Sequence, residues 1–166
     1  MANPMYGQNK SDNGIDMAAN ANLGDLDVIV GGDNQAFTLG KADCCKTYVN
    51  GHANGMDIAL PAVSAADAGL WIKIGVGVTV TSGLISVTAA SGDLLEGNVI
   101  ITKASDAVAN AAYFAADESN DLIFSMNGST TGGLIGSCAK FTVNKKGYWT
   151  VEGQINGSGT LATSFS

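Results

Sequence analysis

Short runs in which apolar and polar residues alternate recur along the chain from Gln35 onward. This period of two is typical of half-buried β-strands, whose successive side chains point to opposite faces of a sheet. Pairs that favour tight turns separate the runs, including Asn-Gly pairs that begin at Asn50, Asn54, Asn127 and Asn156. The predicted strands are Phe37–Leu39, Met56–Leu60, Leu70–Val76, Ile85–Thr88, Ala139–Val143 and Trp149–Glu152.

The clearest predicted hairpin joins Lys140–Val143 to Tyr148–Glu152 through Asn144–Gly147. Gly147 stands where such a loop needs a residue with positive φ. Many short strands with turn signals every ~8–12 residues favour an antiparallel sandwich or barrel. We therefore expect an all-β chain whose main domain is an antiparallel, jelly-roll-like β-sandwich.

Two segments carry helical signals. Ser64–Gly69 follows Pro61 and fits one helical turn with Ser64 as its cap. Ser105–Ala116 is rich in Ala, which favours a helix, but it also fits an irregular strand that ends in Tyr113 and Phe114. Both interpretations of this second segment stay open.

The first 34 residues differ from the rest, because alternation is absent until Leu26–Val30. They are rich in Asn, Asp, Gly and Ala, and a segment of this kind cannot bury itself. We expect residues 1–22 to form an extended arm, with a single helical turn near Asp16–Ala21 as one option. The predicted organisation is an arm and lead-in over residues 1–34 and a β-sandwich domain over residues 35–166.

The composition of the chain excludes several classes of function. The 166 residues include 22 Gly, 2 Pro and 8 Lys but no Arg, and 15 acids give a formal net charge of -7. An acidic chain without Arg or a basic stripe argues against a nucleic-acid partner. No apolar run approaches the ~18 residues of a membrane span, and Met1–Lys10 lacks the apolar core of a signal peptide.

Catalytic and metal-binding motifs are weak. His52 lies in a Gly- and Asn-rich turn without a recognisable nucleophile motif, so we interpret it as an exposed loop residue. Zinc held by His52 with Cys44 or Cys45 is disfavoured because the C-x-x-C spacing is missing. The acids Asp25, Asp27 and Asp33, and Asp117, Glu118 and Asp121, do not follow calcium-loop spacing. We expect no enzyme activity, metal or cofactor.

The cysteines and tryptophans leave alternatives open. Free thiols are favoured for Cys44, Cys45 and Cys138, although a bridge from Cys138 to either neighbour is compatible with the sequence. Trp71 and Trp149 are candidate surface contacts, because exposed Trp often anchors an interface. The competing interpretation is that both tryptophans close the ends of the core.

The order of several segments resembles the small virion structural proteins of tailed phages, in particular those of marine cyanophages. The resemblance covers the opening MANPMYGQNKSDN and roughly Phe37–Phe165. It rests on FTLGKADCCKTYVNG, LPAVSAADAGLWIKIGV, SVTAASGDLLEGNVI and the end strand Gly147–Gly153, which has a GxWxVxG-like pattern. The Cys44-Cys45 pair departs from the Ser-Gly expected in the first of these segments.

The resemblance implies a capsid decoration or cement protein, made in the host cytoplasm and located on the capsid surface of the virion. Its partners would be the major capsid protein and itself, in a homo-oligomer for which a trimer is one candidate state. We place the capsid contacts at Asn3, Pro4, Met5 and Tyr6, since the last three are bulky or rigid groups in an otherwise polar arm. The alternative is a host-surface-binding adhesin, head fibre or tail-fibre component.

Overall fold

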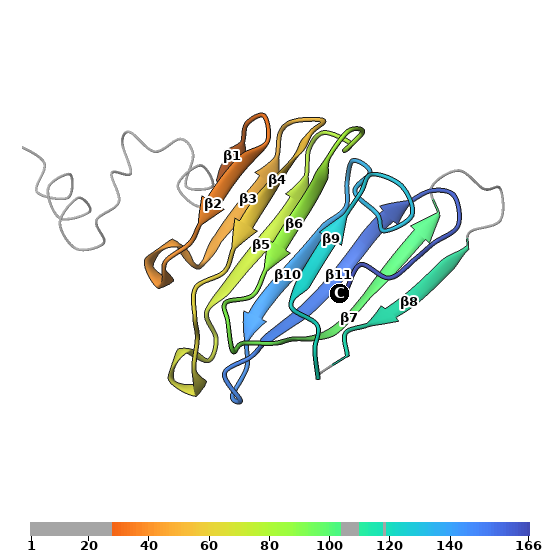
Figure 1. Cartoon of the computed structure of the whole chain (residues 1–166). Coiled ribbons are helices and arrows are strands. Elements are labelled where there is room, and N and C mark those ends of the chain that lie inside the picture. The colour runs from red at the N-terminus through yellow and green to blue at the C-terminus, as the bar shows by residue number, and fades with distance from the viewer. Residues whose placement is uncertain (1–27, 104–109, 118) are drawn as a thin grey trace, which may run out of the picture.

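The computed structural model describes residues 28–103, 110–117 and 119–166, and these residues form two β-sheets. Figure 1 shows β1 and β2 on one side of the molecule and β8 on the other. No helix in this part of the chain is long and apolar enough to cross a membrane. Because the described residues form two β-sheets, the all-β prediction is confirmed.

The larger sheet has seven strands in the order β1-β3-β5-β10-β11-β7-β8. The smaller sheet has four strands in the order β2-β4-β6-β9. The strands of the larger sheet are β1 (Val28–Gly31), β3 (Lys46–Asn50), β5 (Trp71–Val76), β10 (Cys138–Val143), β11 (Trp149–Gly157), β7 (Leu95–Lys103) and β8 (Ala111–Ala115). Those of the smaller sheet are β2 (Gln35–Thr38), β4 (Gly55–Ala59), β6 (Leu84–Thr88) and β9 (Ile123–Met126).

The first six strands alternate between the two sheets. The chain passes from β1 to β2, from β3 to β4 and from β5 to β6, and each time it returns to the larger sheet in the same direction. As a result β1, β3 and β5 are parallel to one another, and so are β2, β4 and β6. The predicted antiparallel pairing is wrong for this half of the fold, and the jelly-roll form of the prediction is not confirmed.

The predicted hairpin is confirmed. Val143 of β10 pairs with Trp149 of β11, and the backbone N–H of Asn144 donates to the carbonyl of Tyr148. Gly147 has a φ of 86°, as the loop requires. The hairpin is inserted between β5 and β7, because β10 is antiparallel to β5 and β11 is parallel to β7.

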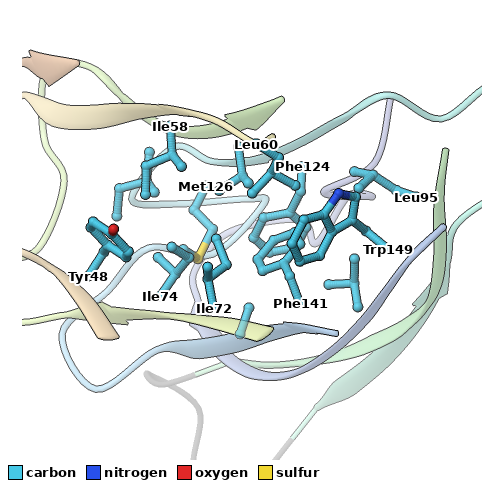
Figure 2. Packing of buried hydrophobic residues seen from close by; sticks show 14 of the residues in the cluster. Tyr48, Ile58, Leu60, Ile72, Ile74, Leu95, Phe124, Met126, Phe141 and Trp149 are labelled. Atoms are coloured by element: carbon cyan, nitrogen blue, oxygen red, sulfur yellow. The ribbon is translucent and has the colours of Figure 1, made fainter. Parts of the chain in front are cut away.

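The core lies between the two sheets (Figure 2). Phe124 of β9 and Phe141 of β10 face each other across it, with ring centroids 5.4 Å apart in an edge-to-face arrangement. Alternate residues of each strand point inward, so that their burial removes apolar surface from water. The largest fully buried side chains are Trp149, Tyr48, Phe124, Phe141, Met56, Ile58, Ile72, Ile74, Ile85, Leu95, Ile101 and Met126.

The edge strands of the two sheets differ in whether another segment of the chain covers them. β9 is covered by residues 164–166, since Ser166 exchanges backbone hydrogen bonds with Ile123 and the N–H of Ser125 donates to Ser164. The other sheet ends are β1, β2 and β8, and each of them has a described strand on one side only. Unpaired edges of this kind present free backbone donors and acceptors for another chain.

The remaining predictions have mixed outcomes. Ser64 precedes the 3₁₀ turn η3 (Ala65–Asp67), which confirms the helical turn, and a second 3₁₀ turn, η2, spans Lys41–Asp43. Of the segment with two interpretations, Ala111–Ala115 forms strand β8. The arm lies outside the described residues, whereas Val28–Gly31 of the predicted lead-in pairs with β3.

Candidate functional site

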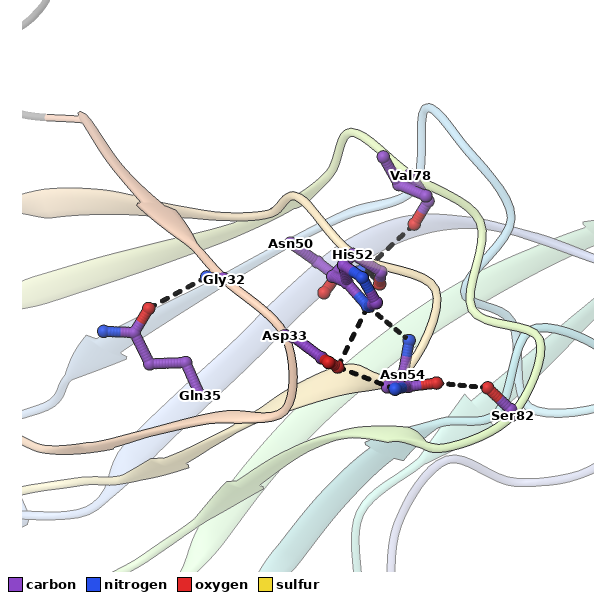
Figure 3. A network of polar contacts seen from close by, with 8 residues as sticks. All are labelled: Gly32, Asp33, Gln35, Asn50, His52, Asn54, Val78 and Ser82. Carbon is purple, nitrogen blue, oxygen red and sulfur yellow. Dashed lines mark hydrogen bonds and ion pairs between the residues drawn. The ribbon is translucent and has the colours of Figure 1, made fainter.

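Polar side chains gather in a cluster of loops at one end of the parallel strands (Figure 3). The loops that join β1 to β2, β3 to β4 and β5 to β6 each cross between the sheets in the same sense. Parallel strands stack these crossings beside one another, so residues far apart in sequence meet. Asp33, His52, Asn54 and Ser82 come together in this way and form what we call the loop cluster.

Asp33 is the centre of the loop cluster. Its Oδ1 lies 3.1 Å from Nδ1 of His52 and accepts a 2.6 Å hydrogen bond from Nδ2 of Asn54. The hydroxyl of Ser82 donates to Oδ1 of Asn54, and the backbone N–H of Asn54 is 3.3 Å from the same imidazole nitrogen. Nδ1 of His52 therefore donates to Asp33 when it carries a proton and accepts from Asn54 when it does not.

This arrangement does not form a nucleophile–base pair. The hydroxyl of Ser82 is bonded to an amide oxygen rather than to the imidazole, so the histidine is not placed to remove its proton. The side chains of His52 and Asp33 are 44% and 62% exposed, which agrees with the interpretation of His52 as a loop residue on the surface. A hollow of about 440 Å³ lies beside them, lined by Asp33, Asn34, Asn54, Ser82 and Gly83.

Asn50 links two loops of the loop cluster through its buried side chain. It was expected in a turn, but it ends β3 and is fully buried. Its Nδ2 donates 2.8 Å hydrogen bonds to the carbonyls of His52 and Val78, which belong to neighbouring loops. The Asn-Gly signal could not reveal this role, because the second loop lies 28 residues away in sequence.

A second group of polar side chains lies on the outer face of the seven-stranded sheet, the face turned away from the smaller sheet. The strand registers align the outward residues in rows across the sheet. One row is Lys73, Lys140, Glu152 and Asn98, and the next is Gly75, Cys138, Gln154, Ile100 and Tyr113. This face is therefore mixed, with charges of both signs beside apolar groups.

An open hollow of about 460 Å³ lies in the middle of this outer face. We call it the sheet hollow; its lining residues are Asn98, Ile100, Cys138, Lys140, Glu152, Gly153 and Gln154. The ammonium of Lys140 also lies 5.4 Å from the ring centroid of Trp71, within range of a cation–π interaction. The hollow thus offers amide, ammonium and carboxylate groups over an apolar floor, with a tryptophan nearby.

The two tryptophans differ in exposure. Trp71 is half-buried on the outer face, where a partner could still reach it. Trp149 is 0% exposed because its position in β11 points into the core, so its interpretation as a surface contact is wrong. Its indole Nε1 has no hydrogen-bond acceptor among the described residues.

The three cysteines are free thiols, as favoured from the sequence. Burial, with added repulsion from Cys45 and Asp43, raises the pKa of the Cys44 thiol, which keeps it protonated and unreactive. Beside it, burial and the charge of Asp43 raise the pKa of Tyr48 to about 12, and the Tyr48 hydroxyl donates to the carbonyl of Asp43. Cys45 is exposed and Cys138 lines the sheet hollow.

The remaining predicted site residues do not form a site among the described residues. Within the ranges that the structure describes, no three His, Cys, Asp or Glu side chains gather into a metal-binding group. The capsid contacts expected at Asn3, Pro4, Met5 and Tyr6 lie outside those ranges. No protein-family model, curated protein or solved structure matches the chain.

Proposed function

We propose that this chain is a structural virion protein of a tailed phage that binds the outside of the major capsid protein shell and stabilises it. The sequence resemblance supplies the virion context, and the fold supports a role in binding rather than catalysis. A sheet edge can bind an extended segment of another protein through backbone hydrogen bonds alone. Such binding suits a chain without Arg, which lacks bidentate side-chain anchors.

The observation that carries the proposal is the open edge at the start of the fold. β1 and β2 are the first strands of their sheets, and no described strand pairs with their outer sides. Val30 in β1 is 65% exposed, and the hydrogen bond from Gly51 to Gly31 leaves the backbone groups of Val30 on the open side. Residues 1–27 directly precede β1 in the sequence, so we propose that the arm and this edge contact one surface of the shell.

The proposal is tested by adding the full chain to purified capsid shells that lack it and measuring bound copies and shell melting temperature. We expect saturable binding at a fixed number of copies per shell and a higher melting temperature. A chain without residues 1–22 should bind with lower occupancy, and so should Val30→Lys, which places a charge on the open edge. Thr160→Ala, an exposed change elsewhere, is the matched control and should bind normally.

Two results would overturn the proposal. Shells that bind no full-length chain, or that melt at the same temperature when saturated, would exclude a cement role. Full occupancy by the chain that lacks residues 1–22 would show that the arm does not contribute to binding. The role of the edge would then be decided by the occupancy of Val30→Lys alone.

The sheet hollow favours a second candidate function, an adhesin or fibre component that binds a surface glycan. Planar amides and charged groups beside an aromatic ring are the groups that hydrogen-bond and stack on sugars. Asn98, Gln154 and Glu152 supply the polar groups and Trp71 the ring. Glycan-array binding that is lost in Gln154→Ala, with no binding to capsid shells, would support this function over the first.

A further inference from the structure

Among the described residues, β8 is an edge strand that no other strand or tail covers on its outer side. It pairs with β7 in an antiparallel register, and its hydrogen bonds to β7 use Asn110 and Ala116 at the two ends. Because bonded residues alternate along such a strand, Ala111, Tyr113 and Ala115 direct their N–H and C=O groups to the open side. These residues point their side chains to the outer face, and Tyr113 is 74% exposed.

The side chains of β8 are unusual for an edge. Its sequence AAYFA has no charged residue and no Pro, the two features that most often prevent edges from associating. Phe114 and Ala112 point toward the core but remain only half-buried, since β8 is the last strand of the longer sheet. β9, at the end of the smaller sheet, is instead covered by residues 164–166.

We propose that β8 is a self-association edge, which pairs antiparallel with β8 of a second copy about a two-fold axis through Tyr113. The axis places Ala111 opposite Ala115 of the second copy and the two Tyr113 residues opposite each other. Each of these three pairs exchanges both backbone hydrogen bonds, which gives about six bonds and one continuous sheet across two chains. The inference does not depend on the proposed capsid role.

A second copy fits this edge better than an unrelated partner for two reasons. The three open residues are symmetric about Tyr113, so a two-fold axis satisfies all of their groups at once. The chain carries a net charge of -7, which opposes self-association in general, but residues 111–115 bring no like charges together. The Tyr113 rings would pack on the outer face, and Phe114 would lie beside Ala112 of the second copy on the inner face.

β1 is another open edge of the same sheet, but it is less suited to self-association than β8. Only four residues form it, and Val30 is an exposed apolar residue on its open side. A pairing of β1 with β8 of another copy would be head-to-tail, which closes only as a larger ring or grows into a filament. A two-fold pairing of β8 stops at two chains.

The test is sedimentation equilibrium of the full chain over a concentration series, with Tyr113→Lys and Val30→Lys as a matched pair. Both substitutions put a lysine in place of an exposed apolar residue at an edge of the same outer face. We expect a reversible dimer for the natural chain and for Val30→Lys, and a monomer for Tyr113→Lys, in which two charges would face each other. Circular dichroism of each variant verifies that the fold is retained.

Cross-linking adds an independent readout. With Cys45 and Cys138 replaced by Ser, Tyr113→Cys should give a disulfide-linked dimer under mild oxidation, because the paired Cα atoms would lie ~5.5 Å apart. Val30→Cys in the same background should remain monomeric on a non-reducing gel. A monomer at every concentration, a trimer, or a dimer that Val30→Lys but not Tyr113→Lys dissociates would overturn the proposal.

Discussion

Gly97 in β7 lies so close to β11 that a Cβ atom on it would stand 2.3 Å from the carbonyl oxygen of Val151. The two residues are register partners in the parallel pairing that fixes the hairpin against β7. Gly97 also has a φ of 104°, a conformation that other residues rarely adopt. This contact sets the spacing of the strands that carry the sheet hollow, which is lined from both β7 and β11.

Gly97→Ala should therefore destabilise the fold by about 3 kcal/mol or more, since the new methyl group clashes with backbone and the positive φ is strained. Urea unfolding followed by circular dichroism measures the loss. Gly69→Ala is the matched control, because Gly69 has a φ of 98° but no atom within 4 Å of the added Cβ. The control should lose about 1–2 kcal/mol from backbone strain alone; equal losses in the two variants would contradict a close β7–β11 contact.

Asn50→Leu should destabilise the loop cluster. The substitution keeps a similar volume but removes two part-buried hydrogen bonds to the carbonyls of His52 and Val78, each of which contributes about 0.5–1.5 kcal/mol. Hydrogen exchange should show faster exchange at the amides of Gly77 and Val78, which donate to the Asn50 carbonyl. His52→Ala removes a half-exposed side chain from the same loops and should change stability by about 0.5 kcal/mol or less.

The sequence predicted which residues of most strands point inward, but not how the strands pair. Met56–Leu60 and Leu70–Val76 match β4 and β5 within one residue at each end. Alternation reports only the two faces of a strand, and it is the same for parallel and antiparallel neighbours. The parallel order arises because each crossing leads to the other sheet, a long-range feature that turn residues do not encode.

Strand β7 was missed for a related reason. Val99, Ile100 and Ile101 are consecutive apolar residues, because Ile100 lies on the outer face while its neighbours fill the core. The loop cluster could not be predicted from the sequence either. His52 was correctly interpreted as a loop residue, but its contact with Asp33 depends on the stacking of separate crossings.

Asp67 should make stability depend on pH in the acid range. The hydrogen bond from Lys41, 2.8 Å from Oδ2, and those from Ser64 hold the pKa of Asp67 below its ordinary value of 3.8. A lowered folded pKa contributes stability that is present above 3.8 and is lost as the pH falls from there through the folded value. The melting temperatures of the natural chain and Asp67→Asn should therefore differ at neutral pH and converge below that range.

Lys41→Met provides the control for this pH dependence. Without the ammonium, the pKa of Asp67 should move back toward its ordinary value, so the acid-dependent part of the stability should shrink although the carboxylate remains. A pH profile unchanged by Lys41→Met would mean that this ion pair is not what lowers the pKa.

Phe165→Ala should both destabilise the protein and expose the covered edge of β9. The Phe165 ring is 5% exposed and packs edge-on against Phe124 with centroids 5.5 Å apart, so its removal leaves a cavity and should cost about 3–5 kcal/mol. The loss also weakens the hydrogen bonds between residues 164–166 and β9, which would open a second unpaired edge and promote aggregation on warming. Urea unfolding and light scattering measure the two effects, and Thr160→Ala, an exposed change in the same segment, should show neither. If Phe165→Ala retained the stability of that control, the covering of β9 would not depend on this side chain.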